Sequence, residues 1–355
     1  MSLFFGKDIG YNKDYIVSVQ VPRDWSSEGV RKMEVIRNEF ASMPQVNNVT
    51  LSFEVPDGNS SGNTAIYRSG ADSTTAKTFT PITTDEYYAA AYSIPMSAGV
   101  FFSNPGELTD STKLVLNETG VKALGWKNAE EAIGRQVRFP GASTDFTIAG
   151  VTKDFHFGSM QAPISPVAFL HVKLGTIFRV LSFKLKPGSI GNSISALQSK
   201  WSTLMPGTPF EYKFMDDTLK KLYKTEIQLK KASYTATVLS FIIVLLGVLG
   251  LIALSVQKRT KEIGIRKVLG SSVKGIIILF MKEFLVIVLV AGIIACPVAY
   301  LLMNSWLKDY EYRIGITATP FITAVVLLAL ITGILIILQT IKTALANPVK
   351  SLRTE

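Results

Sequence analysis

Few side chains in this sequence have the types and spacing that catalysis or metal binding needs. The chain has two histidines and one cysteine, Cys296, too few on their own for a usual zinc site. His156 lies in an alternating segment with no nucleophile or base beside it, so we expect a packed or loop-capping histidine. We expect the adjacent Asp216 and Asp217 to begin a helix and complement its dipole. The sequence therefore predicts no enzyme active site, no metal and no cofactor.

Nucleotide hydrolysis is also not expected of this chain. The motif Gly-x-x-x-x-Gly-Lys-(Ser/Thr), which binds the phosphates of ATP through its backbone, does not occur in the sequence. Any ATP-driven process must therefore involve an ATPase in a partner subunit.

Composition and charge indicate a membrane protein. Of 355 residues, 48% are hydrophobic and 18% are charged, a charged share below the roughly 25% of an average soluble domain. The part from residue 232 to 355 has 12 basic and 5 acidic residues, so it contributes +7 of the net charge of +10. A region that is both apolar and basic is typical of membrane contact rather than nucleic-acid binding.

Three uncharged runs predict transmembrane helices. They comprise 26, 24 and 28 residues, at 232–257, 284–307 and 314–341. Each exceeds the roughly 20 residues that a helix needs to cross the hydrocarbon core. With the flanking residues, we expect spans at about 233–257, 279–306 and 317–341.

The loop between the first two spans is the segment with the most concentrated charge. It carries six basic residues against the single Glu262: Lys258, Arg259, Lys261, Arg266, Lys267 and Lys274. We expect a short amphipathic helix that ends at Gly270, with Ser271 or Ser272 capping the next helix. The basic residues alone could lie along anionic lipid headgroups. Glu262 among the cations, and the helix-weakening Gly264, favour a surface on which another protein docks.

The basic residues also predict the orientation. Positive loops stay in the cytoplasm, so the basic loop and the C-terminus are expected there, with the large N-terminal part outside. The start of the sequence is too short and lacks the basic residues of a signal peptide. We therefore expect a longer protein with at least one preceding span. The alternative, a complete chain with its large domain in the cytoplasm, would place six basic residues outside.

The outer part, residues 1–215, reads as an α+β domain of two subdomains. A strand at 15–21, a helix that Ser26 or Ser27 can cap, and a strand at 48–55 form one strand–helix–strand unit. A second unit comprises a strand at 178–186, a helix at 192–205 and a strand at 210–215. The two units predict one subdomain built from both ends of the domain, with the intervening residues forming a second subdomain.

Residues 216–231 are predicted to form a stalk helix between the outer domain and the first span. Leu219, Leu222, Tyr223 and Ile227 make a helical stripe, and no Pro or Gly lies between Asp216 and Leu246. A single continuous helix is therefore expected. A break near Lys230 and Lys231, at the level of the lipid headgroups, is the alternative.

Small residues in the spans predict close helix packing. A row of alanines at every fourth position lies in the second span, and two glycines lie in the first. These candidate packing residues are Ala291, Ala295, Ala299, Gly247 and Gly250.

Residues 257–270 resemble the cytoplasmic coupling segment of MacB/FtsX-like ABC-transporter permeases, whose signature centres on Arg-Thr-(Lys/Arg)-Glu-Ile-Gly-Ile-Arg-Lys. Similarity to the long two-repeat permeases of Bacteroidetes-type bacteria extends along most of the chain. It includes Lys7-Asp-Ile-Gly-Tyr-Asn-Lys-Asp, Asn117 to Trp126, Ile133-Gly-Arg, Val151-Thr-Lys-Asp-Phe-His-Phe-Gly-Ser-Met, Tyr300 to Tyr312 and Ala346-Asn-Pro-Val-Lys-Ser-Leu-Arg.

The resemblance implies a MacB-like periplasmic core domain over 1–215, the stalk helix, and an FtsX-like permease domain over 232–355 with a coupling segment at 258–271. It implies a bacterial inner-membrane permease that is not itself an enzyme. Its expected partners are a cytoplasmic ABC ATPase, a second permease copy or a missing N-terminal half, membrane lipids and a periplasmic protein. By position, the ATPase would contact Lys261, Glu262, Ile263, Gly264, Ile265, Arg266 and Lys267.

The resemblance implies export or extrusion driven by a partner ATPase through motion of the periplasmic domain. The alternative function is mechanical regulation of a cell-wall hydrolase or a sensor system, without transport. A third, less specific interpretation is a membrane-anchored binding domain that has no ATPase partner.

Overall fold

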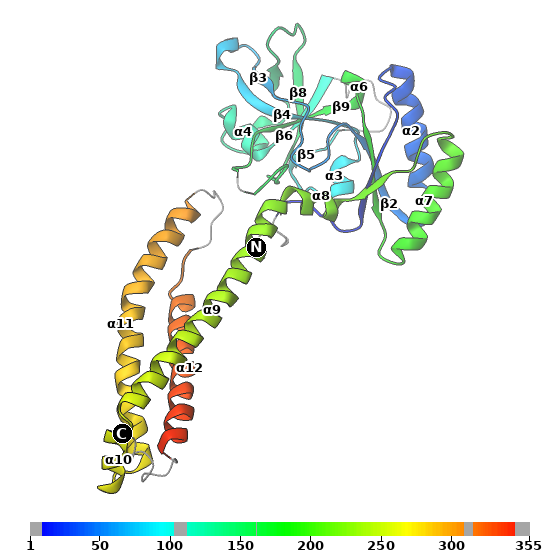
Figure 1. Ribbon diagram of the computed structural model, residues 1–355. Coiled ribbons are helices and arrows are strands. Elements are labelled where there is room, and N and C mark those ends of the chain that lie inside the picture. Colours follow the sequence, from blue (N-terminus) through cyan, green and yellow to red (C-terminus); the bar gives the residue numbers. More distant parts are fainter. Residues whose placement is uncertain (1–8, 103–111, 161, 309–314, 345–355) are drawn as a thin grey trace. The chain divides into compact units, whose positions relative to one another are not determined.

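The computed structural model describes residues 9–102, 112–160, 162–308 and 315–344 (Figure 1). The chain divides into two compact units, Met1–Thr225 and Glu226–Glu355. We call them the outer unit and the helical unit.

The first subdomain of the outer unit is an antiparallel layer of four strands in the order β11-β1-β10-β2. Its helices α2 and α7 pack on one face, where the core contains Phe40, Phe183 and Trp201. The elements are β1 (Ile16–Gln20), α2 (Ser27–Ala41), β2 (Val46–Ser52), β10 (Val180–Leu185), α7 (Ile190–Leu204) and β11 (Tyr212–Phe214). The predicted pair of strand–helix–strand units is confirmed.

Helix α2 shows why these residues fold locally as they do. The Ser26 hydroxyl accepts a hydrogen bond from the backbone N–H of Gly29 at 2.9 Å, which satisfies one of the free donors at the helix start. Val30, Met33 and Phe40 recur at helical spacing and are buried against the sheet. The predicted serine cap and apolar face are both present.

The second subdomain is a ring of six strands. Within the ring each strand pairs with its two neighbours, in the order β4-β3-β7-β8-β6-β9, and the parallel pairing of β9 with β4 closes the ring. Strand β4 also pairs with β2, at Thr84 and Ser52, so the ring and the first layer form one sheet of eleven strands. The strands are β3 (Thr64–Arg68), β4 (Lys77–Thr84), β6 (Lys113–Asn117), β7 (Gln136–Arg138), β8 (Phe146–Thr152) and β9 (Val167–His171). A further strand, β5 (Met96–Gly99), pairs with β8.

Short helices complete the outer unit. They are η2 (Ser73–Thr75), α3 (Tyr88–Tyr92), α4 (Glu118–Ala123), α5 (Ala129–Ala132), α6 (Val172–Gly175) and α8 (Met215–Leu222). A separate hydrophobic core fills the ring, with Phe79 and Ile148 fully buried.

A buried ion-pair network joins the two subdomains. The guanidinium of Arg37, on α2, lies 2.7 Å from the carboxylate of Asp85 and 3.4 Å from that of Glu86. Asp85 also accepts hydrogen bonds from the Thr50 hydroxyl and the Leu51 N–H. Both members of a buried pair lose hydration, so these extra hydrogen bonds are needed to keep the charges favourable inside the protein.

The predicted single stalk helix over 216–231 is wrong. Helix α8 ends at Leu222, and α9 (Lys224–Lys258) begins after a break at Tyr223. Tyr223 is 1% exposed, and its hydroxyl accepts a hydrogen bond from the Met160 N–H at 3.0 Å. This contact with a residue 63 positions away fixes the joint. Helix α9 continues unbroken through Lys230 and Lys231, where the alternative placed a break.

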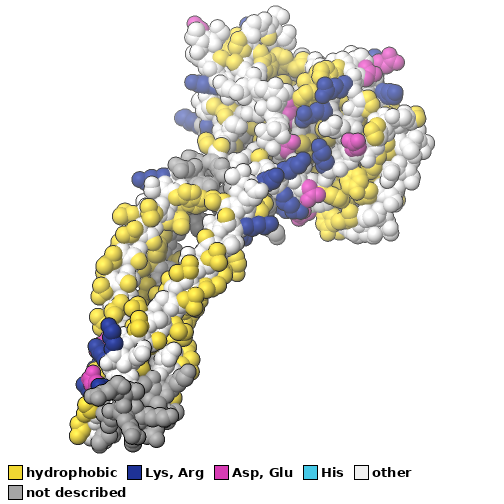
Figure 2. Space-filling model, in the orientation of Figure 1, with side chains coloured by type: hydrophobic (Ala, Val, Ile, Leu, Met, Phe, Trp, Pro, Cys, Tyr) yellow, Lys and Arg dark blue, Asp and Glu magenta, His cyan; other side chains and the backbone are white. Residues whose placement is uncertain are grey.

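The helical unit consists of α9, α10 (Thr260–Val268), α11 (Val273–Leu307) and α12 (Thr319–Ala344). Three segments are long and apolar enough to cross a membrane: Ile227–Lys258, Lys274–Leu307 and Thr319–Ile341. Figure 2 shows hydrophobic side chains over α9 and α11 on the face in view. The three predicted apolar helices are therefore present, and α11 is about 52 Å long at 1.5 Å per residue.

Candidate functional site

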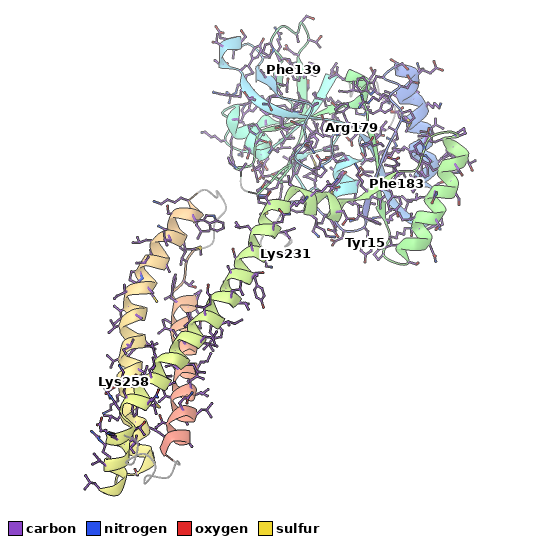
Figure 3. The ribbon with its side chains drawn as sticks, in the orientation of Figure 1. Tyr15, Phe139, Arg179, Phe183, Lys231 and Lys258 are labelled. Carbon is purple, nitrogen blue, oxygen red and sulfur yellow. The ribbon has the colours of Figure 1, made fainter. Side chains whose placement is uncertain are left out.

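The candidate site is the short helix α10, which connects α9 to α11 (Figure 1). Only Arg259 separates it from the end of α9 at Lys258, which is labelled in Figure 3. After α10, Gly270 adopts a positive φ of 89°, a conformation that glycine takes readily. The Ser272 hydroxyl then accepts a hydrogen bond from the Gly275 N–H and caps α11. The predicted glycine stop and serine cap are both confirmed.

One side of α10 is anchored in the core of the helical unit. Ile263 is 5% exposed and belongs to a cluster of six buried residues. Gly264 is also buried. The cluster comprises Ile252, Val256, Ile263, Ile276, Phe280 and Ile336, from all four helices. Ile263 and Gly264, two of the seven residues expected to contact the ATPase, are therefore buried within the helical unit, and their part in that contact stays a prediction.

The other side of α10 is exposed. Lys261, Glu262 and Arg266 are exposed, and so is Ile265, at 52%. Leu269, just beyond the helix, is 80% exposed. The side chain of Lys267 lies outside the described residues. The apolar residues of this segment therefore divide, with Ile263 facing inward and Ile265 and Leu269 facing outward.

Glu262 already has a partner within the helix. Its carboxylate lies 2.8 Å from the guanidinium of Arg266, one turn later. Exposed pairs at this spacing stabilise a helix by only about 0.3–0.5 kcal/mol. The pair can therefore be exchanged for contacts with another protein at little cost.

A second ion pair, between Arg259 and Glu283, fixes the junction between α9 and α10 and was not predicted from the sequence. The Nη1 atom of Arg259 lies 2.8 and 2.9 Å from the two carboxylate oxygens of Glu283, on α11. The guanidinium also lies over the ring of Phe280, 5.7 Å from its centroid. Glu283 lies 24 residues from Arg259, and the only signal for this pair was an acid next to the basic Lys282 at the start of the second span.

None of the residues predicted for helix packing is buried in the described part of the chain, and their packing role stays a prediction. Ala291, Ala295 and Ala299 are exposed. A Cβ at Gly247 or Gly250 would meet nothing within 4 Å. The close approach of α11 and α12 occurs instead at Gly292, where a Cβ would lie 3.0 Å from the Val325 side chain.

The residues considered for acid–base or metal chemistry have ordinary structural roles. The backbone N–H of His156 donates to the Ile9 carbonyl, and burial lowers the pKa of its imidazole although Asp154 opposes the shift. Asp216 pairs with Lys13 and Asp217 with Lys220, both at 2.9 Å. No group of three or more His, Cys, Asp or Glu side chains suitable for a metal ion occurs in the described ranges.

Comparison with known sequences identifies the family. The profile of the MacB-like periplasmic core domain matches residues 7–198, more than half of the chain, and that of the FtsX-like permease C-terminal domain matches residues 234–348. The chain belongs to the MacB/FtsX-like permease family of ABC transporters. The family membership inferred from the sequence motifs is confirmed.

Two relatives of this permease are named as macrolide export ATP-binding/permease proteins MacB. The one from Rhodospirillum rubrum is 26% identical over 278 residues, which cover 76% of this chain and 42% of the relative. The one from Azoarcus sp. is 25% identical over 280 residues, covering 76% and 39%. The chain thus spans about two fifths of the length of these relatives.

Among solved structures, the periplasmic region of MacB from Actinobacillus actinomycetemcomitans is similar to the permease with a TM-score of 0.41 and 14% sequence identity. The match covers 64% of this chain and 98% of that structure.

Proposed function

We propose that this chain is the permease subunit, or the C-terminal half of one, of a MacB/FtsX-type ABC transporter. In this proposal a partner ATPase drives motion of the outer unit for export or extrusion. The observation that carries the proposal is the two-sided placement of α10. Its outer side presents apolar Ile265 among charged residues, while Ile263 is buried with the other helices.

The packing of α10 supports a mechanical role. Close-packed cores have few voids and low compressibility, so a displacement of one element is transmitted to the elements packed against it. Ile263 shares its cluster with residues of α9, α11 and α12, and Arg259 ties the α9–α10 junction to α11. A force applied to the exposed side of α10 is therefore passed to all the long helices rather than absorbed by a loose loop.

The proposed topology follows from charge. The six basic residues between 258 and 274 favour a cytoplasmic position for α10 and the C-terminus. The outer unit is then periplasmic, and the protein is a multi-pass component of a bacterial inner membrane. The exposed alanine row on α11 favours a further helix as neighbour, from a second copy or a preceding half.

The test is site-specific photo-cross-linking in cells. We expect a photoreactive residue at position 265 to capture a protein that contains an ATP-binding phosphate loop. As a control, the photoreactive residue replaces Leu338, which is 61% exposed on α12. At this position we expect it to capture lipid or other helices instead. In membranes that contain both proteins, Ile265→Asp should abolish the stimulation of ATP hydrolysis by the permease. Capture of lipid alone at position 265, or full ATPase stimulation with Ile265→Asp, would show that α10 is not the coupling element.

A second measurement tests the topology. With Cys296 replaced by serine, single cysteines are introduced at Lys32 and Lys261, both exposed. A membrane-impermeant maleimide added to intact spheroplasts should label position 32 and spare position 261. The reverse pattern would place α10 outside the cell, where no cytoplasmic ATPase could reach it.

A further inference from the structure

The outer unit contains a polar pocket of about 620 Å³ that none of the roles described above uses. Its floor is the face of the antiparallel layer opposite α2 and α7. Val17 and Val19 on β1 belong to the core beneath those helices. Ser18 and Gln20 alternate with them, so they lie on the opposite face and line the pocket.

The walls come from two other parts of the outer unit. One is the loop after β2, which contributes Asp57, Gly58 and Asn59. The other is α8, which contributes Thr218, Lys221 and Leu222. A Cβ on Gly58 would lie 3.4 Å from the side chain of Leu222, so loop and helix are in contact. The pocket is therefore a site built from the layer, the loop and α8.

The pocket gathers charges of both signs. Its cations are Arg179, Lys213 and Lys221, and its acids are Asp57 and Glu211. Within the part of the chain that the structure describes, Lys213, Lys221 and Glu211 have no ion-pair partner. By contrast, Lys220, the neighbour of Lys221 on α8, pairs with Asp217 at 2.9 Å and does not line this pocket.

Arg179 lines the pocket and is held in place by contacts with Phe53; Figure 3 labels it in the outer unit. Its Nε donates to the Phe53 carbonyl at 3.1 Å, and its guanidinium lies over the Phe53 ring, 5.1 Å from the centroid. Its terminal nitrogens have no hydrogen-bond partner among the described residues. A fixed guanidinium with free N–H groups is well suited to bind an anionic oxygen.

We propose that this pocket binds a phosphate ester that also carries an ammonium group, the chemistry of phosphoethanolamine. Three cations around one pocket suit a phosphate, whose oxygens accept several hydrogen bonds. A ligand with only a negative charge would be repelled by Asp57 and Glu211. A ligand with only a positive charge would be repelled by the three cations. A ligand with both groups satisfies all five side chains. The volume falls within the range of about 300–1,000 Å³ that is usual for small-molecule sites.

Because α8 lines the pocket, a bound ligand should affect the position of this helix. Lys221 and Leu222 lie at the end of α8, immediately before the Tyr223 joint and α9. A ligand held by Lys221 and the sheet therefore favours one position of α8 over others. The site belongs to the outer unit alone, so it goes beyond the proposed coupling function and does not depend on an ATPase.

The experiment is calorimetric titration of the full chain in lipid nanodiscs, with no ATPase or nucleotide present. The probe is glycerophosphoethanolamine, and inorganic phosphate is titrated separately. We expect saturable binding of the probe by the wild-type chain. Substituting both Lys213→Gln and Lys221→Gln should weaken it about tenfold or more, because two charge-assisted hydrogen bonds are lost. Lys220→Gln, on the next residue of the same helix, should leave it unchanged.

A second variant tests the acidic side of the pocket. Glu211→Gln should weaken binding of glycerophosphoethanolamine, and binding of inorganic phosphate should stay the same or tighten. Because Glu211 is exposed, this substitution is not expected to affect folding. Equal loss of both ligands, or an effect of Lys220→Gln as large as that of the double variant, would overturn the proposal.

The composition of the nanodiscs distinguishes the two sources of this chemistry. Equal binding of the probe with and without phosphatidylethanolamine in the bilayer supports a free phosphate ester as the occupant. Binding only in discs that lack this lipid supports the lipid headgroup, because the headgroup then competes with the probe. No saturable binding in either kind of disc overturns the proposal.

Discussion

The outer and helical units bury their apolar residues in opposite ways. The outer unit has two extensive cores, with the large rings of Phe40, Phe183 and Trp201 almost fully buried. Among the residues that the structure describes, the helical unit has one cluster of six buried residues, and most of its large apolar side chains, such as Leu301 at 65%, are exposed. The outer unit is therefore stabilised by its own interior, whereas the helical unit depends on an apolar environment around it.

Within the described part of the helical unit, the packing around α10 resembles that of a soluble core. There, Ile263 and Phe280 are as well buried as residues of the outer layer. The buried cluster of the helical unit thus lies at the segment proposed to receive force, whereas most of its other large apolar side chains are exposed and can contact lipid or other helices.

Removal of a buried ring from the core of the outer unit should change stability most. Phe183→Ala removes a fully buried ring that packs 5.1 Å from the ring of Phe40, centroid to centroid (Figure 3). We expect the free energy of unfolding of the outer unit to fall by about 3–5 kcal/mol. Urea titration of the full chain in detergent, followed by tryptophan fluorescence, measures the change. Leu301→Ala serves as the control in the helical unit and should not change the urea midpoint at which the outer unit unfolds. Equal decreases of this midpoint in both variants would contradict the contrast between the units.

The next effect compares two residues of α10. Ile263→Ala leaves a cavity in the cluster and should destabilise the packing of α10 by about 2–4 kcal/mol. Ile265→Ala, on the exposed side, should have almost no effect on stability. Hydrogen exchange of peptides that span residues 255–280, measured by mass spectrometry in nanodiscs, should be faster only for Ile263→Ala. Similar exchange in both variants would mean that α10 is not anchored.

A smaller effect tests which residues of α11 are packed. Gly292→Val places a side chain against Val325 on α12 and should destabilise this contact by about 1–3 kcal/mol. Ala295→Val, one turn away and exposed, should change nothing in the isolated chain. Hydrogen exchange of α12 peptides reads out both variants. A change with Ala295→Val only when a second permease chain is present would identify the alanine row as a helix interface.

The smallest effect is a pH dependence confined to the outer unit. Burial of Glu86 opposes its charged form, but His171 and Arg37, each 3.4 Å away, bring its pKa below the ordinary 4.5. The folded pKa is thus lower than the unfolded one. Ionised Glu86 therefore stabilises the folded outer unit at pH values above the pKa that Glu86 has in the unfolded chain. This stabilisation is lost as the pH falls through the lower pKa of Glu86 in the folded protein.

Glu86→Gln removes this titration. We expect a lower urea midpoint than wild type near neutral pH and a smaller decrease between about pH 5 and pH 3. Parallel decreases in both proteins would show that Glu86 is not the group responsible.

Local patterns predicted the elements of both units well. The length of the uncharged runs is enough to identify the three apolar helices. The helical spacing of apolar residues after a capping serine is enough to identify α2. The exposed charges of α10 were also predictable, because Lys261 and Arg266 have no apolar role in an amphipathic helix.

Contacts between distant residues could not be predicted in this way. The pairing of Arg37 with Asp85 joins residues 48 apart, and the buried arginine lies on what the spacing alone would call an apolar face. The break at Tyr223 depends on the Met160 N–H and not on any helix-breaking residue nearby. For the same reason, the inward position of Ile263 and the outward position of Ile265 depend on contacts with α9, α11 and α12 and not on α10 alone.

The closed ring of strands has a consequence for the behaviour of the outer unit at high concentration. Unpaired strand edges are templates on which another chain can add a strand and begin to aggregate. Among the described strands, β11 and β5 pair with one neighbour each, and they have only three and four residues. Such short edges give an incoming strand few backbone partners, so another copy of the outer unit should add a strand at β11 or β5 less readily than at a longer edge.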